Sequence, residues 1–323
     1  TMNWLDYSII LFYIIFFLGM GFFFKDNKDS KDYFLGGKSM GWFPLSLSTM
    51  ATQLSAISFI SAPAFVGLKL GGGMKWLTFE FAVPLAMIFI MIVIIPPLFR
   101  SGVVSIYEFV EKRFSTSTRL ILSIVFQISR ALGTGVMVYA IAIILQAILD
   151  IDFVYTILII SVITIIYSWQ GGMKAVVWGD AIQMIILFAG LIICLYFGWN
   201  LLQEHGGLEA GFAPERLKVI DYNLGIGEGN EYGLLPMIIG GFFLYASYYG
   251  CDQTQAQRML SAKDEKTIKQ LLLANGLLRF PIVLIYCIMG LVIGGLITIA
   301  PGFLEEIAIT TQKYFPEEYA AHG

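Results

Sequence analysis

The chain has 323 residues, of which 58% are hydrophobic and 13% are charged, and its net charge is −3. A soluble domain of this size carries roughly 25% charged residues, so the apolar excess indicates lipid as the solvent and an all-α polytopic membrane protein. The slightly acidic balance excludes the broad basic surface that nucleic-acid binding requires.

The few chemically reactive residues argue against an enzyme. Both histidines, His205 and His322, fall in expected loops, which leaves no histidine-based metal site or catalytic triad. The three cysteines lie in or beside apolar stretches, and buried thiols fit them better than a disulfide framework. Nothing in the sequence indicates an obligate protein partner.

Apolar runs of about 20 residues predict helices that cross a bilayer. Eight such runs are expected, at residues 5–24, 42–67, 75–99, 119–149, 154–170, 175–200, 233–252 and 270–299. The last is followed by a polar and amphipathic loop, residues 300–323, without a further span. We therefore expect the protein to continue beyond Gly323.

The positive charges predict the orientation of these spans, because cytoplasmic loops are enriched in lysine and arginine. One set of alternate loops holds most of them: Lys25, Lys28, Lys31, Lys38, Arg100, Lys112, Arg113, Arg119, Lys174, Arg258, Lys263, Lys266 and Lys269. The opposite set holds Lys69, Lys75, Arg216, Lys218 and Lys313. We expect the first set to be cytoplasmic and the N-terminus to lie outside.

Two spans carry signals of a broken helix. The second has serine and threonine through its middle, from Ser46 to Ser61, followed by Pro63, and the seventh has the pair Gly240-Gly241 and the mid-depth Tyr245 and Tyr248. Interrupted helices at matching places in an inverted repeat form substrate and ion sites at the membrane midplane. Serine that simply packs between helices is the alternative for any single position.

Four ionisable residues lie within or at the edge of the expected spans: Glu80, Arg130, Asp180 and Arg279. A charge in the bilayer costs at least ~2.5–3.5 kcal/mol on insertion scales, so each needs a partner or a cavity. Glu80 either contacts a hydroxyl-rich or cationic ligand or pairs with one of the two arginines. Asp180 either binds Na⁺ or pairs with Lys174.

The segment Gly171–Gln183 reads GG-x-x-x-V-x-W-x-D-x-x-Q and resembles the signature of the sodium:solute symporter family. Three further blocks agree in order and spacing, at Asp32–Lys38, Tyr107–Phe114 and Gln257-Arg258. The resemblance covers essentially the whole chain and is to the bacterial sodium/sugar and sodium/sialic acid symporters.

This resemblance implies a LeuT-like fold of two five-helix inverted repeats, preceded by the extra helix 5–24. Residues 1–323 are then the N-terminal part of one transmembrane domain, with the first repeat at about 42–200 and the start of the second at about 233–299. It also implies a multi-pass protein of the cell membrane that works by alternating access, driven by the sodium gradient.

The resemblance also implies ion sites. The family pattern A-x-x-[ILM]-S falls on Ala51, Leu54 and Ser55, so the backbone carbonyls of Ala51 and Leu54 are expected to bind Na⁺. Some relatives hold a second Na⁺ at the aspartate that corresponds to Asp180. In both sites the family adds serine side chains from a later helix, which does not occur before Gly323.

Substrate positions carry over one by one. Gln53, Ser55 and Ser58 match ligand-contacting positions in sugar and sialic acid symporters. Glu80 matches a glutamate of the galactose carriers and a glutamine of the sialic acid carriers, and Trp76 matches an aromatic residue that lines the site of the latter.

The remaining positions lie on later spans. Tyr248 matches the aromatic inner gate, and Arg279 falls where the galactose carriers keep a lysine that contacts the sugar. The arginine that holds the carboxylate in sialic acid carriers aligns with Gly133, one helical turn from Arg130. Tyr245 joins this set from its mid-depth position.

We therefore expect sodium-coupled symport of a sugar or a sugar acid such as sialic acid. The alternatives are a sodium-coupled monocarboxylate or amino-acid symporter, and a sensor domain built on a transporter scaffold. The expected partners are Na⁺, a small solute and the lipid bilayer.

Overall fold

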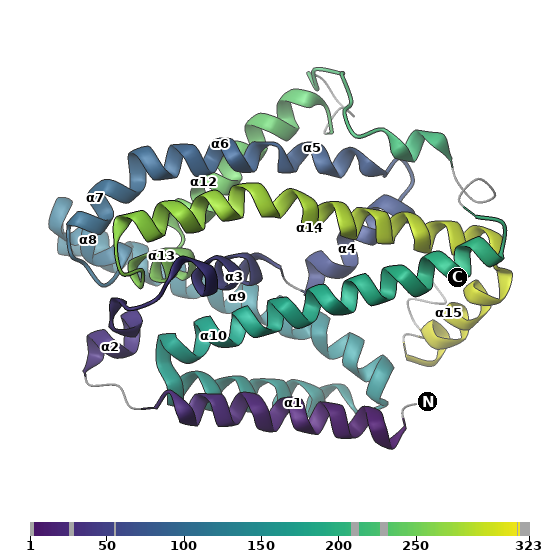
Figure 1. Cartoon of the computed structure of the whole chain (residues 1–323), viewed down its shortest axis with the longest axis horizontal. Helices are drawn as coiled ribbons and strands as arrows, with labels where there is room; N and C mark the ends of the chain where they lie inside the picture. The colour runs from purple at the N-terminus through teal and green to yellow at the C-terminus, as the bar shows by residue number, and fades with distance from the viewer. Residues whose placement is uncertain are drawn as a thin grey trace.

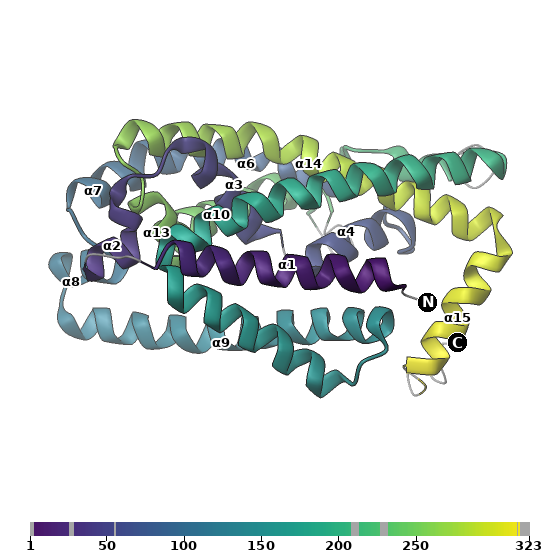
Figure 2. The same ribbon diagram turned by 60° about the horizontal axis from the view of Figure 1, so that its bottom comes forward.

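The computed structural model describes residues 3–25, 29–54, 56–207, 213–226, 232–314 and 316. Within these ranges the chain is helical and no β-strand forms, although an isolated bridge joins Met40 to Ala262. The long helices run roughly side by side along the long axis of the molecule (Figure 1). Figure 2 shows the same bundle tilted, with α9 (Thr116–Leu149) along its lower edge and α14 (Glu265–Ile299) along the top.

The helices follow the predicted spans closely. The corresponding elements are α1 (Trp4–Phe23), α3 (Trp42–Gln53) with α4 (Ala56–Gly67), the segment Met74–Arg100, α9, both halves of α10 (Phe153–Glu204), η5 (Pro236–Gly240) with α12 (Gly241–Cys251), and α14. Among the described residues, five helices alone are long and apolar enough to span a membrane, or six with the bent pair α3–α4. The higher predicted number arises because α10 holds two predicted spans and the span at 233–252 is shorter in the structure.

The segment Met74–Arg100 is a succession of helical types rather than one regular helix. It contains η2 (Met74–Trp76), α5 (Leu77–Glu80), α6 (Ala82–Phe89), η3 (Ile90–Ile94) and α7 (Ile95–Arg100). Short helices and helical turns also occupy the connections: α2 (Ser30–Leu35), η1 (Gly36–Lys38), α8 (Ile106–Arg113), η4 (Pro214–Leu217), α13 (Gln253–Leu260) and α15 (Pro301–Tyr314). The last corrects the expected amphipathic loop after residue 300, because most of that segment is a helix.

The 52-residue helix α10 is two helices joined at Gly172. This residue has φ 57° and ψ −152°, a conformation that only glycine adopts readily. A side chain there would also meet Tyr33, whose carbonyl oxygen lies 2.8 Å from the position a Cβ would take. Gly172 therefore lets the chain turn between the two helical halves of α10, and α2 packs against this turn.

The crossing of α4 and α14 depends on glycines at its contact points. A Cβ on Gly67 would overlap the carbonyl oxygen of Gly290, and a Cβ on Gly290 would overlap the backbone of Pro63. Small residues let helix backbones approach closely in membranes, where van der Waals packing and interhelical hydrogen bonds hold helices together. This close contact fixes α4, the second half of the broken second span, against α14.

The side of the bundle at α9 and α1 is apolar and exposed. Leu120, Ile121, Ile128 and Leu132 of α9 are all more than half exposed, as is Phe12 of α1. The elements next to the lysine-rich and arginine-rich loops, α2, α7, α8 and α13, gather at one end of the bundle, whereas the N-terminus and α15 lie at the other (Figure 1). This separation of apolar sides and charged ends is the pattern expected of a protein that spans a bilayer.

The surface helix α8 begins with reciprocal capping at its N-terminus. The Glu108 carboxylate accepts a hydrogen bond from the Val104 amide at 2.9 Å, and the Glu108 amide donates to the Ser105 hydroxyl at 3.2 Å. The bond from Val104 holds the pKa of the Glu108 carboxyl below its ordinary value, because it favours the charged form. Capping of this kind fixes the start of a short helix at the end of the bundle.

We predict that Gly290→Val destabilises the protein, because the added side chain meets the backbone of Pro63 and no side-chain rotation relieves the overlap. Overpacking of this kind costs about 1–3 kcal/mol, which thermal unfolding in detergent would detect as a lower Tm. Gly190→Ala in α10 is the matched control, since nothing lies within 4 Å of its Cβ position. Equal Tm values for the two variants would contradict a glycine-dependent crossing.

Candidate substrate and ion site

The second span is broken at its middle, as predicted. Helix α3 ends at Gln53, Leu54 has the non-helical angles φ −87° and ψ 85°, and the two halves of the span are bent by 62°. The Leu54 amide closes the last turn on the carbonyls of Ala51 and Met50, at 3.1 and 3.2 Å. A break of this kind frees carbonyl oxygens from the helical ladder, and such oxygens are suitable ligands for hard cations. Ser55 lies outside the described residues.

The expected break in the seventh span takes another form. Gly240 and Gly241 both keep helical angles, near φ −60° and ψ −44°, so the helix does not unwind at this pair. The irregularity is instead a π-helical turn over Pro236–Gly240, where the proline lacks an amide hydrogen. The chain leaves the helix only at Asp252, with φ −77° and ψ 128°, between α12 and α13.

A cavity of about 520 Å³ lies beside the break in the second span. Its wall comes from α3, α4, η2, α5, α9, α12 and α14, which are far apart in the sequence. The lining residues are Thr52, Gln53, Leu54, Ser58, Ser61, Ala62, Trp76, Phe79, Glu80, Met137, Leu244, Tyr245, Tyr248, Arg279, Val283 and Tyr286. The mixture of aromatic rings with a few converging polar groups is typical of a small-molecule site.

Seven of the predicted substrate residues line this cavity: Gln53, Ser58, Trp76, Glu80, Tyr245, Tyr248 and Arg279. Leu54, predicted to bind sodium, lines the cavity as well. Ala51 is not among the lining residues and packs against a buried cluster that includes Met50 and Tyr286. Residues predicted from separate spans therefore converge on one cavity.

Glu80 and Arg279 form a buried ion pair in the wall of the cavity. The Arg279 Nε lies 2.6 Å from the Glu80 Oε2, and the Glu80 side chain is only 2% exposed. The Tyr245 hydroxyl donates to the other Glu80 oxygen at 2.9 Å, and the Arg279 guanidinium lies over the Tyr245 ring at 4.9 Å from its centroid. Of the two interpretations left open for Glu80, the structure shows pairing with Arg279.

The same network extends to the break in the second span. Arg279 donates to the side-chain oxygen of Gln53, and the Tyr249 hydroxyl donates to that oxygen at 2.6 Å. Tyr249 also lies 3.4 Å from the side-chain oxygen of Asn275, which is completely buried. The last residue of α3 is thereby tied to α12 and α14.

Arg130, predicted to contact the substrate, is not among the residues that line the cavity in this structure. Its guanidinium pairs with Asp252, the residue that caps α13 through a 2.8 Å bond from the Thr254 amide. Asp252 is the last residue of the predicted seventh span and was not among the ionisable residues considered, so the sequence did not predict this pair. Tyr248 donates to the Thr52 carbonyl at 3.3 Å.

Asp180 belongs to a second network, outside the cavity. Its Oδ2 accepts from the Ser48 hydroxyl at 2.6 Å and from the Arg258 Nη2 at 2.7 Å. Arg258 also donates through Nε to the Ser48 oxygen at 2.7 Å and is 8% exposed. The alternative pairing of Asp180 with Lys174 is wrong, because Lys174 pairs with Asp32 at 2.9 Å.

Among the site residues, sequence reasoning did not select Asn275, Tyr249 and Asp252, which belong to these networks, or Tyr286, which lines the cavity. Asn275 and Arg279 are four residues apart in the last span, and Tyr286 follows two turns after Arg279, so one polar stripe on a helix links them. That spacing was the available signal. Among the described residues, no group of three or more His, Cys, Asp or Glu could hold a metal ion.

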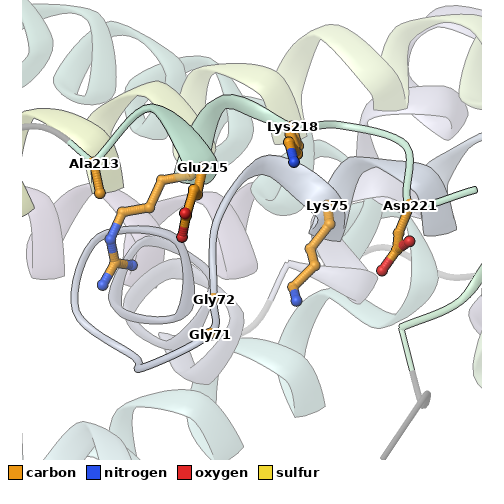
Figure 3. Close-up of a pocket in the computed structure, with 8 residues that line it drawn as sticks. Gly71, Gly72, Lys75, Ala213, Glu215, Lys218 and Asp221 are labelled. Atoms are coloured by element: carbon orange, nitrogen blue, oxygen red, sulfur yellow. The ribbon is translucent and has the colours of Figure 1, made fainter. Parts of the chain in front are cut away.

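A second hollow, of about 320 Å³, lies between the loop before η2 and the segment around η4 (Figure 3). Its lining is mainly charged and consists of Gly71, Gly72, Lys75, Ala213, Glu215, Arg216, Lys218 and Asp221. Arg216 donates to the Val66 carbonyl at 2.8 Å, and the Thr78 hydroxyl donates to the Val219 carbonyl at 2.5 Å. These bonds hold the segment against the end of α4 and against α5, which follows Trp76.

Comparison with known proteins identifies the family of the chain. The profile of the sodium:solute symporter family matches residues 33–320. The chain belongs to the sodium:solute symporter family. A solved structure of a Na⁺-coupled sialic acid symporter, in a substrate-bound outward-open state, has the same fold, with a TM-score of 0.79 and 24% identity over 91% of this chain and 62% of that one.

The similar curated proteins are sodium-coupled transporters named for different solutes. The sodium-coupled monocarboxylate transporter 2 of Danio rerio is 31% identical over 268 residues, which cover 80% of this chain and 42% of that protein. The human sodium/iodide cotransporter is 29% identical over 286 residues, which cover 86% of this chain and 43% of that protein. The chain thus spans less than half the length of each of these two relatives.

We predict that breaking the Glu80–Arg279 pair from one side destabilises the protein strongly. Arg279→Ala leaves the Glu80 carboxylate buried without its cation, a loss of about 3–5 kcal/mol for a buried pair. The double variant Glu80→Gln/Arg279→Gln removes both charges and is expected to recover part of that loss, as measured by thermal unfolding in detergent. If the double variant is as unstable as the sum of the single variants Glu80→Gln and Arg279→Gln, the two charges do not act as a pair.

Proposed function

We propose that this chain is the N-terminal part of a secondary active transporter that couples the entry of a small polar organic solute to sodium. The observation that carries the proposal is the break in the second span. The last residues of α3, before this break, border a cavity that is lined by aromatic rings and several polar side chains. A helix break that borders such a cavity supplies carbonyl oxygens for an ion and polar side chains for a solute at the same depth. Alternating access around this site would couple the two movements.

The proposed sodium site uses the backbone carbonyls of Ala51 and Leu54. Support comes from the end of α3 at Gln53 and the non-helical angles of Leu54, which interrupt the hydrogen-bond ladder here. Na⁺ is a hard cation that prefers oxygen ligands, so this site needs none of the His, Cys, Asp or Glu clusters that are absent from the described residues. The proposed orientation, with the N-terminus outside, is supported by the arginine-rich and lysine-rich end of the bundle.

For the solute we propose a sugar or a sugar acid such as sialic acid, held by Gln53, Ser58, Trp76, Tyr248 and Arg279. The cavity of about 520 Å³ has room for such a molecule and offers amide, hydroxyl and guanidinium groups to its oxygen atoms. A monocarboxylate is the second candidate, favoured by the similarity to monocarboxylate transporters. Glu80 is paired with Arg279, so we assign it a positioning role for that arginine.

Transport by the full-length protein in proteoliposomes tests the proposal directly. An inward sodium gradient is expected to drive accumulation of at least one of N-acetylneuraminate, D-galactose and L-lactate, and replacement of sodium by choline is expected to abolish it. The direction of coupling follows from the gradient, so collapse of the gradient with a sodium ionophore should release the accumulated solute. Uptake that is indifferent to sodium for all three solutes would contradict symport.

Asp180 is proposed as part of a second sodium site in a state in which Arg258 has moved away. In the structure the guanidinium supplies the positive charge that a sodium ion would supply, bound to the same carboxylate and to Ser48. A sodium ion and Arg258 therefore compete for Asp180.

We predict that Asp180→Asn and Arg258→Gln have different effects on sodium dependence, although both break the same ion pair. Asp180→Asn removes a charged sodium ligand and should raise the sodium concentration for half-maximal uptake several-fold. Arg258→Gln removes the competing cation and should leave that concentration unchanged or lower it. Sodium titrations of uptake in proteoliposomes give both values, and parallel shifts in the two variants would identify Asp180 as a structural pair residue only.

A further inference from the structure

The hydroxyl of Tyr286 is a buried polar group of the cavity wall that has no hydrogen-bond partner among the described residues. Tyr286 lines the cavity and is 2% exposed, and its hydroxyl oxygen is buried without a hydrogen-bond partner among the described residues. Buried polar groups are nearly always hydrogen-bonded, and one that is not often marks a place where a ligand or an ordered water binds.

The other tyrosines of the cavity behave differently. Tyr245 donates to the Glu80 carboxylate at 2.9 Å, and Tyr248 donates to the Thr52 carbonyl at 3.3 Å. Both hydroxyls therefore have partners within the protein. Of the three tyrosines that line the described cavity, Tyr286 is the one whose hydroxyl has no hydrogen-bond partner among the described residues.

The ring of Tyr286 is held in place by its neighbours. It makes an edge-to-face contact with Phe59 of α4, with centroids 5.6 Å apart, and it belongs to a buried cluster with Met50, Met184 and Ile282. A hydroxyl on a ring fixed in this way is positioned before any ligand arrives, which lowers the entropy lost on binding.

The position of Tyr286 along α14 relates it to the Arg279 network. Arg279, Val283 and Tyr286 all line the cavity, at the spacing i, i+4 and i+7 that places residues on one face of a helix. Seven residues correspond to about 10 Å along the helix axis. Tyr286 thus lines the cavity on the same helix face as Arg279, and Leu54, at the break, packs against the cluster that contains Tyr286.

We propose that Tyr286 is a specificity-determining residue that donates its hydroxyl to a carboxylate or hydroxyl oxygen of the transported solute. A phenol hydroxyl donates one hydrogen bond and accepts others, so it fits an oxygen-bearing solute and gives nothing to an apolar one. This assignment rests on the proposed function of the cavity as the solute site.

The test compares Tyr286→Phe with wild type in the full-length protein. The substitution removes only the hydroxyl and keeps the ring contacts, so we expect the Tm to be unchanged or raised. Binding of N-acetylneuraminate, D-galactose and L-lactate is measured by thermal shift in sodium, and uptake of each is measured in proteoliposomes. For the probes that wild type binds, Tyr286→Phe is expected to weaken binding and raise KM by about threefold to tenfold, the size of one hydrogen bond.

Tyr196→Phe is the matched control, since this tyrosine is exposed on α10 away from the cavity, and it should leave both measurements unchanged. Sodium-induced thermal shifts without solute should be the same in wild type and Tyr286→Phe. A reduced sodium response in that assay would make Tyr286 part of the ion site and would overturn the proposal. Unchanged binding of every probe by Tyr286→Phe would overturn it as well.

These measurements separate this inference from the proposed function. If wild type binds a probe but shows no sodium-driven uptake, symport fails while the binding data still decide the role of Tyr286. If wild type binds none of the three oxygen-rich probes, the assignment of an oxygen-bearing solute to this hydroxyl is overturned.

Discussion

The pairing of charges inside the membrane is the constraint on which this structure depends. Lipid offers no compensation for an ionised side chain, so each charge within the spans must meet an opposite charge or a polar cavity. Four charges predicted within or at the edge of the spans, Glu80, Arg130, Asp180 and Arg279, form three buried or half-buried pairs among the described residues: Glu80–Arg279, Asp180–Arg258 and Arg130–Asp252. Each pair joins elements that are distant in the sequence, so the same contacts that neutralise charge also decide which helices are neighbours.

Two of these pairs contact α3, the first half of the broken second span. At the middle of α3, the Ser48 hydroxyl bonds to both members of the Asp180–Arg258 pair. At its C-terminal end, Gln53 accepts from Arg279, which is itself bound to Glu80. A movement of α3 relative to α10 or α14 must therefore rearrange buried charge, and such networks have few stable arrangements. A transporter that alternates between discrete states needs a scaffold of this kind.

The second half of the same span, α4, is held by a different interaction. The glycines of α4 and α14 bring the two backbones into direct contact, with no charged group involved. Packing of this type tolerates little change in volume, whereas ion pairs can exchange partners. The break at Leu54 thus separates a half-span fixed by close packing from one fixed by exchangeable polar contacts.

The sequence by itself determined the helical membrane architecture, the position of the break near Leu54 and half of the cavity wall. Apolar length, proline and polar content are local properties of a span, so Glu80 and Arg279 could be selected before any fold was known, whereas Gln53 and Trp76 were selected through the family resemblance. It could not determine partners. Asp180 was weighed against the nearby Lys174 and pairs instead with Arg258, and Arg130 pairs with Asp252 at the end of the predicted seventh span. Only the tertiary structure decided these, and the unpaired state of Tyr286, because electrostatic and hydrogen-bond partners depend on distances between helices that no periodicity along one helix encodes.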